Sequence, residues 1–162
     1  MRAERDLPFG DDEETVDPSV EIEAVAVRLL AVREHSRHEL HNKLGRGFDR
    51  DTVQAVLDQL VECGLVSDER FTEHYVASRI RKGFGPLRIR AELRERGIDG
   101  DLIEAWLDLE DGAWCECLRE VARRRFGDER TADRRIQAKQ ARFLQYRGFP
   151  ESLIRDYLWG VA

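Results

Sequence analysis

A repeat of about fifty residues constrains the fold of this chain more than any other feature of its sequence. Each copy begins with Gly followed by Phe or Ile, and has a β-branched residue six positions after the Gly and a Leu ten positions after it. The copies start at Gly47, Gly97 and Gly148, which are 50 and 51 residues apart. Such a period is typical of tandem units that stack on their neighbours, because one small unit buries too little apolar surface by itself.

The spacing within each copy predicts a corner between two helices. Each Gly follows a leucine of a preceding helical segment: Leu44, Leu93 and Leu144. The offset is three residues in the first copy and four in the other two, so the first corner is one residue shorter. A Gly just past a helix end can adopt a positive φ and close the last turn, and we expect this at all three corners. The branched residue and the Leu then lie four apart, on one face of the next helix.

Capping residues and apolar periodicity together predict about nine helices and no strands. The expected helices lie near residues 20–33, 36–45, 49–63, 67–82, 86–96, 99–109, 112–126, 133–147 and 150–160. The expected N-caps are Ser36, Asp49, Ser67, Asp99 and Thr131. Gly85 breaks one helix, and Pro86 starts the next. The fold class is therefore all-α, an elongated array of three tandem three-helix repeats over residues 19–66, 67–111 and 112–162.

Charge is unevenly distributed along the chain. The net charge is -6, of which residues 1–18 contribute -5. This leading segment has few apolar residues and no periodicity, and we expect a disordered acidic tail. Two later segments, 79–96 and 119–147, are strongly basic, and guanidinium groups suit phosphates and carboxylates. The candidate residues for binding a partner or nucleic acid are Arg79, Arg81, Lys82, Arg88, Arg90, Arg94, Arg96, Arg123, Arg124 and Arg125.

Residues that would support catalysis or metal binding are missing from the sequence pattern. Cys115 and Cys117 form a Cys-x-Cys pair far from Cys63, without the second ligand pair of a zinc site. The histidines at 35, 38 and 41 do not form a zinc-protease motif, and we expect them at the polar surface. The three tryptophans, at 106, 114 and 159, are expected in the core rather than stacked on bases. We therefore expect no enzyme activity, no cofactor and no metal.

The chain also has the features of a cytoplasmic protein. Three Cys, an odd number, argue against a disulfide framework. No apolar run reaches the roughly 18–20 residues of a membrane helix, and the N-terminus has no signal-peptide core. We expect a monomer with no membrane partner.

Several motifs resemble the RecX family of regulatory proteins. They are residues 65–71 (LVSDERF), 75–79 (YVASR), 82–86 (KGFGP), 97–98 (GI) and 143–149 (FLQYRGF). The order and spacing of these motifs and the three repeats carry the resemblance, which covers about residues 22 to 160. The resemblance implies three tandem three-helix repeats and a non-enzymatic protein that binds the RecA recombinase filament. It also implies inhibition of filament assembly, strand exchange and co-protease activity, and thus regulation of homologous recombination, DNA repair and the SOS response.

A second interpretation is a direct DNA-binding protein. Three-helix units also occur as helix-turn-helix DNA readers, and the two basic segments would suit either single-stranded or double-stranded DNA.

Overall fold

The structure, a computed structural model, describes residues 16–108 and 112–160. The described residues form nine α-helices and no strand, which confirms the expected fold class. The helices are α1 (Pro18–Val32), α2 (Arg37–Leu44), α3 (Arg50–Glu62), α4 (Asp68–Arg81), α5 (Pro86–Glu95), α6 (Gly100–Trp106), α7 (Ala113–Phe126), α8 (Arg134–Arg147) and α9 (Glu151–Trp159). The largest difference from expectation is at α6, which ends at Trp106 instead of near residue 109.

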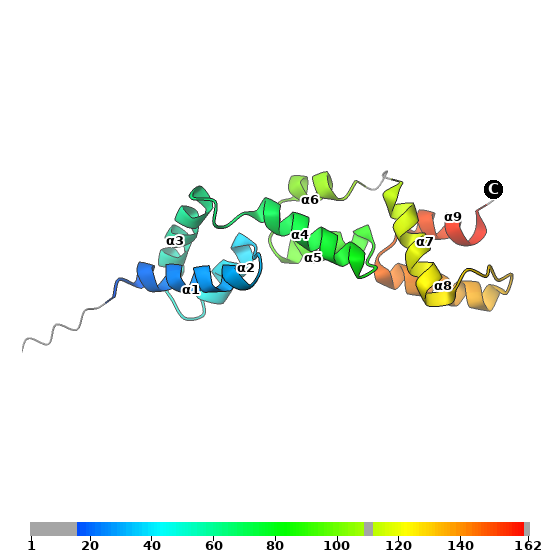
Figure 1. Ribbon diagram of the computed structural model, residues 1–162, viewed down its shortest axis with the longest axis horizontal. Coiled ribbons are helices and arrows are strands. Elements are labelled where there is room, and N and C mark those ends of the chain that lie inside the picture. Colours follow the sequence, from blue (N-terminus) through cyan, green and yellow to red (C-terminus); the bar gives the residue numbers. More distant parts are fainter. Residues whose placement is uncertain (1–15, 109–111, 161–162) are drawn as a thin grey trace, which may run out of the picture.

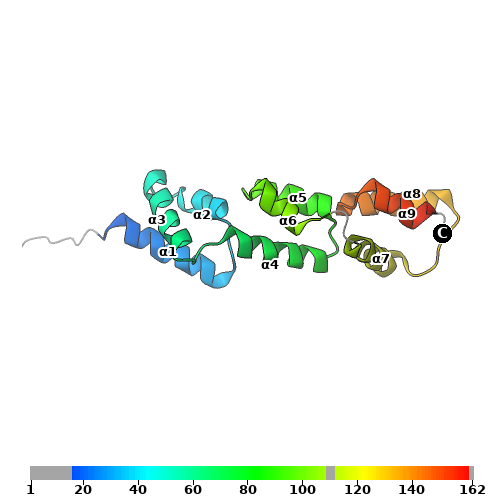
Figure 2. The same cartoon turned by 90° about the horizontal axis from the view of Figure 1, so that it is seen from above.

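The nine helices form three units in a row. Helices α1 to α3, α4 to α6 and α7 to α9 each group together, and the units follow one another along the long axis of the molecule (Figure 1). The view from above shows the same row, with α1 and α9 in the units at opposite ends (Figure 2). An elongated array leaves much of each unit in contact with water, which agrees with a charged fraction of 37%.

Side-chain caps begin most of the helices. Ser36, Asp49, Ser67 and Asp99 each accept a hydrogen bond from a backbone N–H in the first turn of the following helix, as expected. The expectation for Thr131 is wrong, because Asp133 caps α8 and accepts from the Arg135 N–H at 2.8 Å.

The first helix begins inside the segment expected to be an acidic tail. Asp17 accepts from the backbone N–H of Ser19 at 2.9 Å, and Pro18 occupies the first helical position. Residues 17 and 18 are therefore part of the start of α1. Residues 1–15, the remainder of the expected tail apart from Val16, lie outside the described residues.

The repeated Gly corners close in two ways. Gly97 has φ +71° and Gly148 has φ +94°, as expected for glycines that end a helix. The expectation is wrong for Gly47, which is not among the positive-φ glycines. In the later corners, the N–H of Ile98 or Phe149 donates to the leucine carbonyl five residues earlier. In the shorter first corner, Phe48 donates to Leu44 only four residues earlier, so the chain turns without positive φ.

The buried apolar residues form two separate cores. The first repeat has its own cluster, which includes Leu40, Leu44 and Leu57. The second and third repeats share one cluster, which runs from Phe71 in α4 to Ile154 in α9. The second and third repeats therefore pack as one body, and the first repeat is a smaller body beside it.

The tryptophans meet the core expectation only in part. Trp114 is buried in the shared core with 5% exposure. The expectation is wrong for the other two, because Trp106 is 36% and Trp159 50% exposed. Both stand at helix ends, where the chain leaves the packed interior, and the Trp159 indole N–H donates to the Gln137 side-chain carbonyl.

Consecutive repeats meet through the same geometry twice. The corner at Gly97 packs against His38 in the first turn of α2, and the corner at Gly148 packs against Arg88 in the first turn of α5. His38 and Arg88 are 50 residues apart, as the sequence period requires. Each junction thus sets the start of the middle helix of one repeat against the end of the middle helix of the next.

Candidate anion-binding groove

The two basic segments of the sequence meet at the junction of the second and third repeats. A groove of ≈ 180 Å³ lies between the α4–α5 turn, α7 and the end of α8. Its lining consists of Arg81, Lys82, Gly83, Val121, Arg124, Arg125, Phe143 and Arg147. Five of these residues are cationic and none is acidic, so the groove concentrates positive charge.

Most of this positive charge is not neutralised within the protein. Arg124 forms an ion pair with Glu120 at 2.6 Å, with 67% of the arginine side chain exposed. Among the described residues, Arg81, Lys82, Arg125 and Arg147 form no ion pair. Arg147 is held in place by a hydrogen bond of 2.9 Å to the Lys82 carbonyl. Unpaired guanidinium groups side by side are well suited to an anion with several oxygens, such as a phosphate or carboxylate.

A series of arginine and aromatic side chains positions the groove. Arg88 and Arg147 lie over the ring of Phe84, with guanidinium carbons 4.4 and 5.0 Å from its centroid. Arg147 also lies 5.2 Å from the centroid of Phe143, and Arg125 lies 5.9 Å from the same ring. These contacts cross from the second repeat to the third, and they position two of the groove cations, Arg125 and Arg147, against aromatic rings.

Glu92 anchors the other end of this series. Its carboxylate accepts hydrogen bonds from Arg79 at 2.6 and 2.7 Å, from Arg88 at 3.2 Å and from the Tyr75 hydroxyl at 2.8 Å. Burial by itself would raise the pKa of Glu92, but the hydrogen bonds from Tyr75, Arg79 and Arg88 outweigh burial and lower it. Glu92 is therefore ionised at neutral pH and fixes two of the predicted arginines.

The ten predicted residues fall into two groups in the structure. Six form ion pairs inside the protein: Arg79 and Arg88 with Glu92, Arg90 with Glu104, Arg96 with Glu39, and Arg123 and Arg124 with Glu120. The other four have no ion pair among the described residues: Arg81, Lys82, Arg94 and Arg125. The groove brings together Arg81, Lys82, Arg124 and Arg125, whereas Arg94 is exposed on α5 outside the groove lining.

Sequence reasoning missed three residues at this junction. Arg147 and Phe143 line the groove, and Tyr146 lies beside them with 72% of its surface exposed. A signal for Arg147 was present, because it ends the second basic segment immediately before the Gly148 corner. No local signal in the sequence indicates that Tyr146 is exposed. The aromatic residues near it in the chain, Phe143 and Phe149, are packed in or against the core, and the sequence does not distinguish Tyr146 from them.

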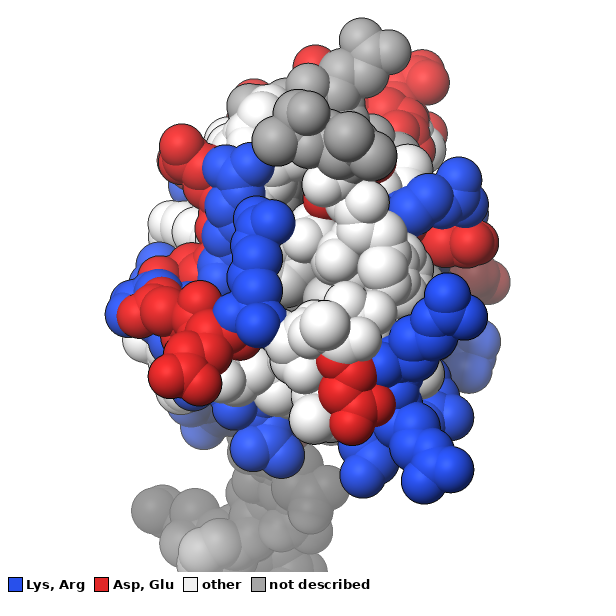
Figure 3. All heavy atoms as spheres, turned by 90° about the vertical axis from the view of Figure 1, so that its right-hand side faces the viewer, with Lys and Arg blue, Asp and Glu red and all other residues white. Residues whose placement is uncertain are grey.

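The molecule also has charged side chains on its end face. Looking onto the third repeat along the array, Lys and Arg side chains lie on both sides of an uncharged strip (Figure 3). Acidic side chains are interspersed at this end, unlike in the groove lining.

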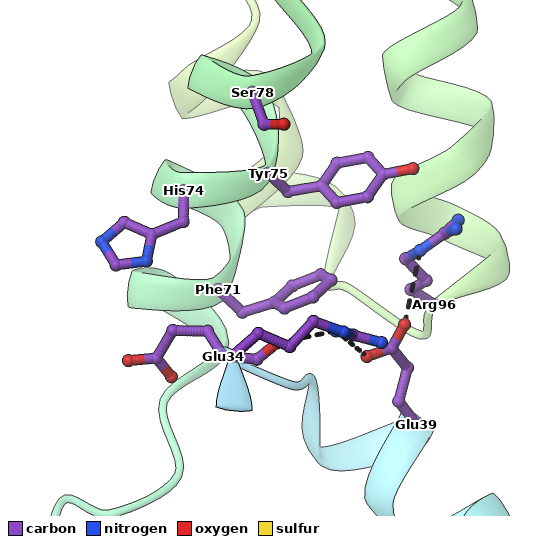
Figure 4. A pocket seen from close by; sticks show the side chains of 8 residues that line it. Glu34, Glu39, Phe71, His74, Tyr75, Ser78 and Arg96 are labelled. Carbon is purple, nitrogen blue, oxygen red and sulfur yellow. Dashed lines mark hydrogen bonds and ion pairs between the residues drawn. The ribbon is translucent and has the colours of Figure 1, made fainter. Parts of the chain in front are cut away.

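A second hollow lies at the junction of the first and second repeats. This pocket of ≈ 380 Å³ has the stacked rings of Phe71 and Tyr75 from α4 on one side (Figure 4). Opposite them, Glu39 accepts from Arg33 at 3.1 Å and pairs with Arg96 at 3.4 Å. Since its cations are paired with acids, this pocket does not concentrate charge of either sign.

His35 is buried, and Cys117 is partly buried against the core of the second and third repeats. The expectation of a surface position is wrong for His35, which is 2% exposed and hydrogen-bonded to the Arg33 carbonyl at 3.0 Å. Its burial lowers the pKa of the imidazole. Burial disfavours the charged form of the Cys117 thiol as well, and this raises its pKa. Within residues 16–108 and 112–160, no group of three or more His, Cys, Asp or Glu side chains is arranged to hold a metal ion.

Models of known protein families match all three repeats of the array. Family models described as the first, second and third three-helix domains of RecX match residues 24–60, 67–107 and 115–158. The chain belongs to the RecX family. These three matches fall on the three structural repeats in the same order.

Relatives in this family are similar over most of their length. The Regulatory protein RecX of Pseudomonas syringae pv. tomato is 44% identical over 146 residues, covering 90% of this chain and 94% of that relative. The Regulatory protein RecX of Halorhodospira halophila is 47% identical over 131 residues, covering 80% of this chain and 81% of that relative. Both relatives are named as regulatory proteins.

Solved RecX structures have the same fold. The crystal structure of RecX from Lactobacillus salivarius gives a TM-score of 0.73 at 24% identity, covering 88% of this chain and 94% of that one. A second structure, described as regulatory protein RecX, gives 0.75 at 22% identity, covering 90% and 74%. In the part of the chain described here, no helix has the length and apolar character needed to cross a lipid bilayer.

Proposed function

We propose that this RecX-family protein binds the RecA nucleoprotein filament and inhibits its assembly, strand exchange and co-protease activity. The observation that carries the proposal is the 41–47% identity to proteins named Regulatory protein RecX over most of the chain. The regulator would act in the cytoplasm as a monomer, without a cofactor and without catalysing a reaction.

The shape of the molecule supports this proposal. A row of three similar units can lie along the groove of a helical filament and contact successive protomers, as a compact domain of this size could not. Repeating contacts of moderate strength add through effective concentration. The body would also occupy space that incoming duplex DNA needs, which accounts for inhibition of strand exchange.

The unpaired cations of the groove indicate which surface of the protein would contact the filament. Of the ten arginine and lysine candidates, three line the groove and form no ion pair among the described residues, and we propose that these three, Arg81, Lys82 and Arg125, carry the electrostatic part of binding. Arg79 and Arg88 are proposed to act indirectly, because Glu92 holds them in position. Truncating those two would disturb the protein itself as well as any partner contact.

The test measures inhibition of RecA-dependent strand exchange beside binding to filament-coated and bare DNA at matched salt. The variant Arg81→Ala/Lys82→Ala is expected to inhibit less than the parent chain. The control is Arg46→Ala, which removes an exposed cation at the first corner, outside the groove. A parent chain that bound bare DNA clearly more tightly than filament would contradict the proposal. That result would favour the direct DNA-binding interpretation, whose support is the five-cation groove.

A further inference from the structure

Tyr146 is an exposed aromatic residue on α8, the helix that supplies Phe143 and Arg147 to the groove. It lies in the last turn of α8, one residue before the groove residue Arg147. The guanidinium carbon of Arg88 lies 5.2 Å from the centroid of the Tyr146 ring, and Arg88 also donates to the Tyr146 carbonyl at 3.4 Å. Since 72% of the residue remains exposed, the ring has one face supported and its remaining surface open to solvent.

An open aromatic ring one residue from Arg147, an unpaired cation of the groove, matches the two chemical features of a single nucleic-acid strand. Cations neutralise the phosphodiester backbone, and an aromatic ring stacks on an unpaired base. We propose that the junction of the second and third repeats binds single-stranded nucleic acid, with phosphates in the groove and a base on Tyr146. The binding is independent of sequence, because every base has a face that can stack.

The two parts of this site belong to one rigid unit. The backbone N–H of Gly85 donates to the Arg147 carbonyl at 2.7 Å, and that of Leu87 donates to the Gly148 carbonyl at 2.9 Å. These bonds join the α5 start, which carries Arg88, to the α8 end, which carries Tyr146 and Arg147. The fold therefore sets the backbone positions of Tyr146, Arg147 and Arg88 relative to one another before any strand binds.

The exposed tyrosine distinguishes a single strand from other anionic partners. Bases in a duplex are stacked on one another and present edges, so a duplex would use the cations but not the ring face. An acidic protein surface would likewise satisfy Arg81, Lys82 and Arg125 through carboxylates. A contribution from Tyr146 therefore identifies the occupant as a strand with free bases.

The experiment uses the full chain without RecA, and its probes are labelled oligothymidylate and a duplex of equal length. Oligothymidylate stacks little on itself, so the stacking measured is that of the protein. Tyr146→Ala is expected to weaken oligothymidylate binding by about fivefold to a hundredfold, the effect of losing one stacked base. Tyr146→Phe is expected to bind like the parent, and duplex affinity is expected to be unchanged in both variants.

A salt series separates the cations from the ring. Lys82→Ala is expected to reduce the slope of log affinity against log salt by about 0.7, whereas Tyr146→Ala leaves the slope unchanged. Arg46→Ala and Trp159→Ala serve as controls for an exposed cation and an exposed aromatic residue away from the groove. Circular dichroism confirms that each variant is folded.

The outcomes divide cleanly. Parent-like oligothymidylate binding by Tyr146→Ala would overturn the assignment of a base-stacking residue. An unchanged salt slope in Lys82→Ala would overturn the assignment of the groove to phosphates. If Arg81→Ala/Lys82→Ala loses inhibition of the filament but keeps parent affinity for oligothymidylate, the groove contacts a protein surface and the strand inference is wrong. The filament proposal stands in that case, so the two can fail separately.

Discussion

Gly148→Ala tests whether the junction of the second and third repeats depends on close backbone contact. Gly148 has φ +94°, where an alanine costs about 1–2 kcal/mol. An added Cβ would also lie 2.4 Å from Arg88 Cβ and 2.6 Å from the Arg88 backbone nitrogen. Because backbone in α5 cannot rotate away as a flexible side chain would, the two repeats must separate.

The expected loss follows from the bonds that separation breaks. The Gly85 to Arg147 and Leu87 to Gly148 hydrogen bonds cross this junction, and each contributes about 0.5–1.5 kcal/mol net. Together with the φ cost, the free energy of unfolding should fall by about 2–5 kcal/mol. Denaturant unfolding followed by far-ultraviolet circular dichroism measures this directly.

The matched control is Gly47→Ala, at the equivalent position of the first repeat. An added Cβ there meets no atom within 4 Å, and φ is not positive. We expect the stability of this variant to equal that of the parent or to exceed it by up to about 1 kcal/mol, because alanine restricts the unfolded chain. Equal destabilisation by Gly47→Ala and Gly148→Ala, or none by Gly148→Ala, would refute the reasoning.

Two further predictions concern charge. The pKa of Glu92 is lowered on folding. Its ion pairs therefore stabilise the folded protein fully at pH values above the ordinary glutamate pKa of about 4.3. This stabilisation is lost as the pH falls through the lower pKa of the folded state. Glu92→Gln should therefore lose stability at pH 7 and show a flatter acid-unfolding profile than the parent; profiles of equal slope would contradict this. Ion pairs such as the part-buried Arg70–Glu34, at 2.9 Å, link the first and second repeats. Added salt should weaken them and so speed amide hydrogen exchange in α1–α3 relative to α4–α9. Uniform exchange across all nine helices would contradict the separate core of the first repeat.

The helices and corners were predictable because their signals are local. A Ser or Asp cap, a Pro in the first turn and a Gly after the last turn act within a few residues of one another. The first corner shows the limit of this reasoning. The missing residue of this corner was visible in the sequence. The way the shorter turn closes was not, because it depends on the hydrogen bond from the Phe48 N–H to the Leu44 carbonyl, which forms without positive φ at Gly47.

The candidate site was predictable only as two separate basic segments. Nothing local indicates that the turn after α4 meets α7 and the end of α8, since that contact depends on how one repeat stacks on the next. The same limitation applies to the ion pairs. Arg90 and Glu104 are 14 residues apart and pair at 2.7 Å because α5 and α6 pack together, which removes Arg90 from the set of unpaired cations. His35 shows the converse error, because a polar residue near a helix cap was buried by its neighbours.

The two junctions repeat one geometry but differ in what fills it, and this difference locates the site. At the first junction the contacts are polar, such as the Ser36 hydroxyl to the Arg96 carbonyl at 2.7 Å and the Arg37 N–H to Asp68 at 2.8 Å. The Glu34 Oε2 atom there is buried without a hydrogen-bond partner among the described residues, so the junction is less completely satisfied than a packed core. The second junction continues the apolar core across both repeats. The five-cation groove therefore lies at the junction whose apolar core is continuous across both repeats. Two of its cations, Arg125 and Arg147, already lie against aromatic rings, so their ordering is achieved during folding instead of during binding.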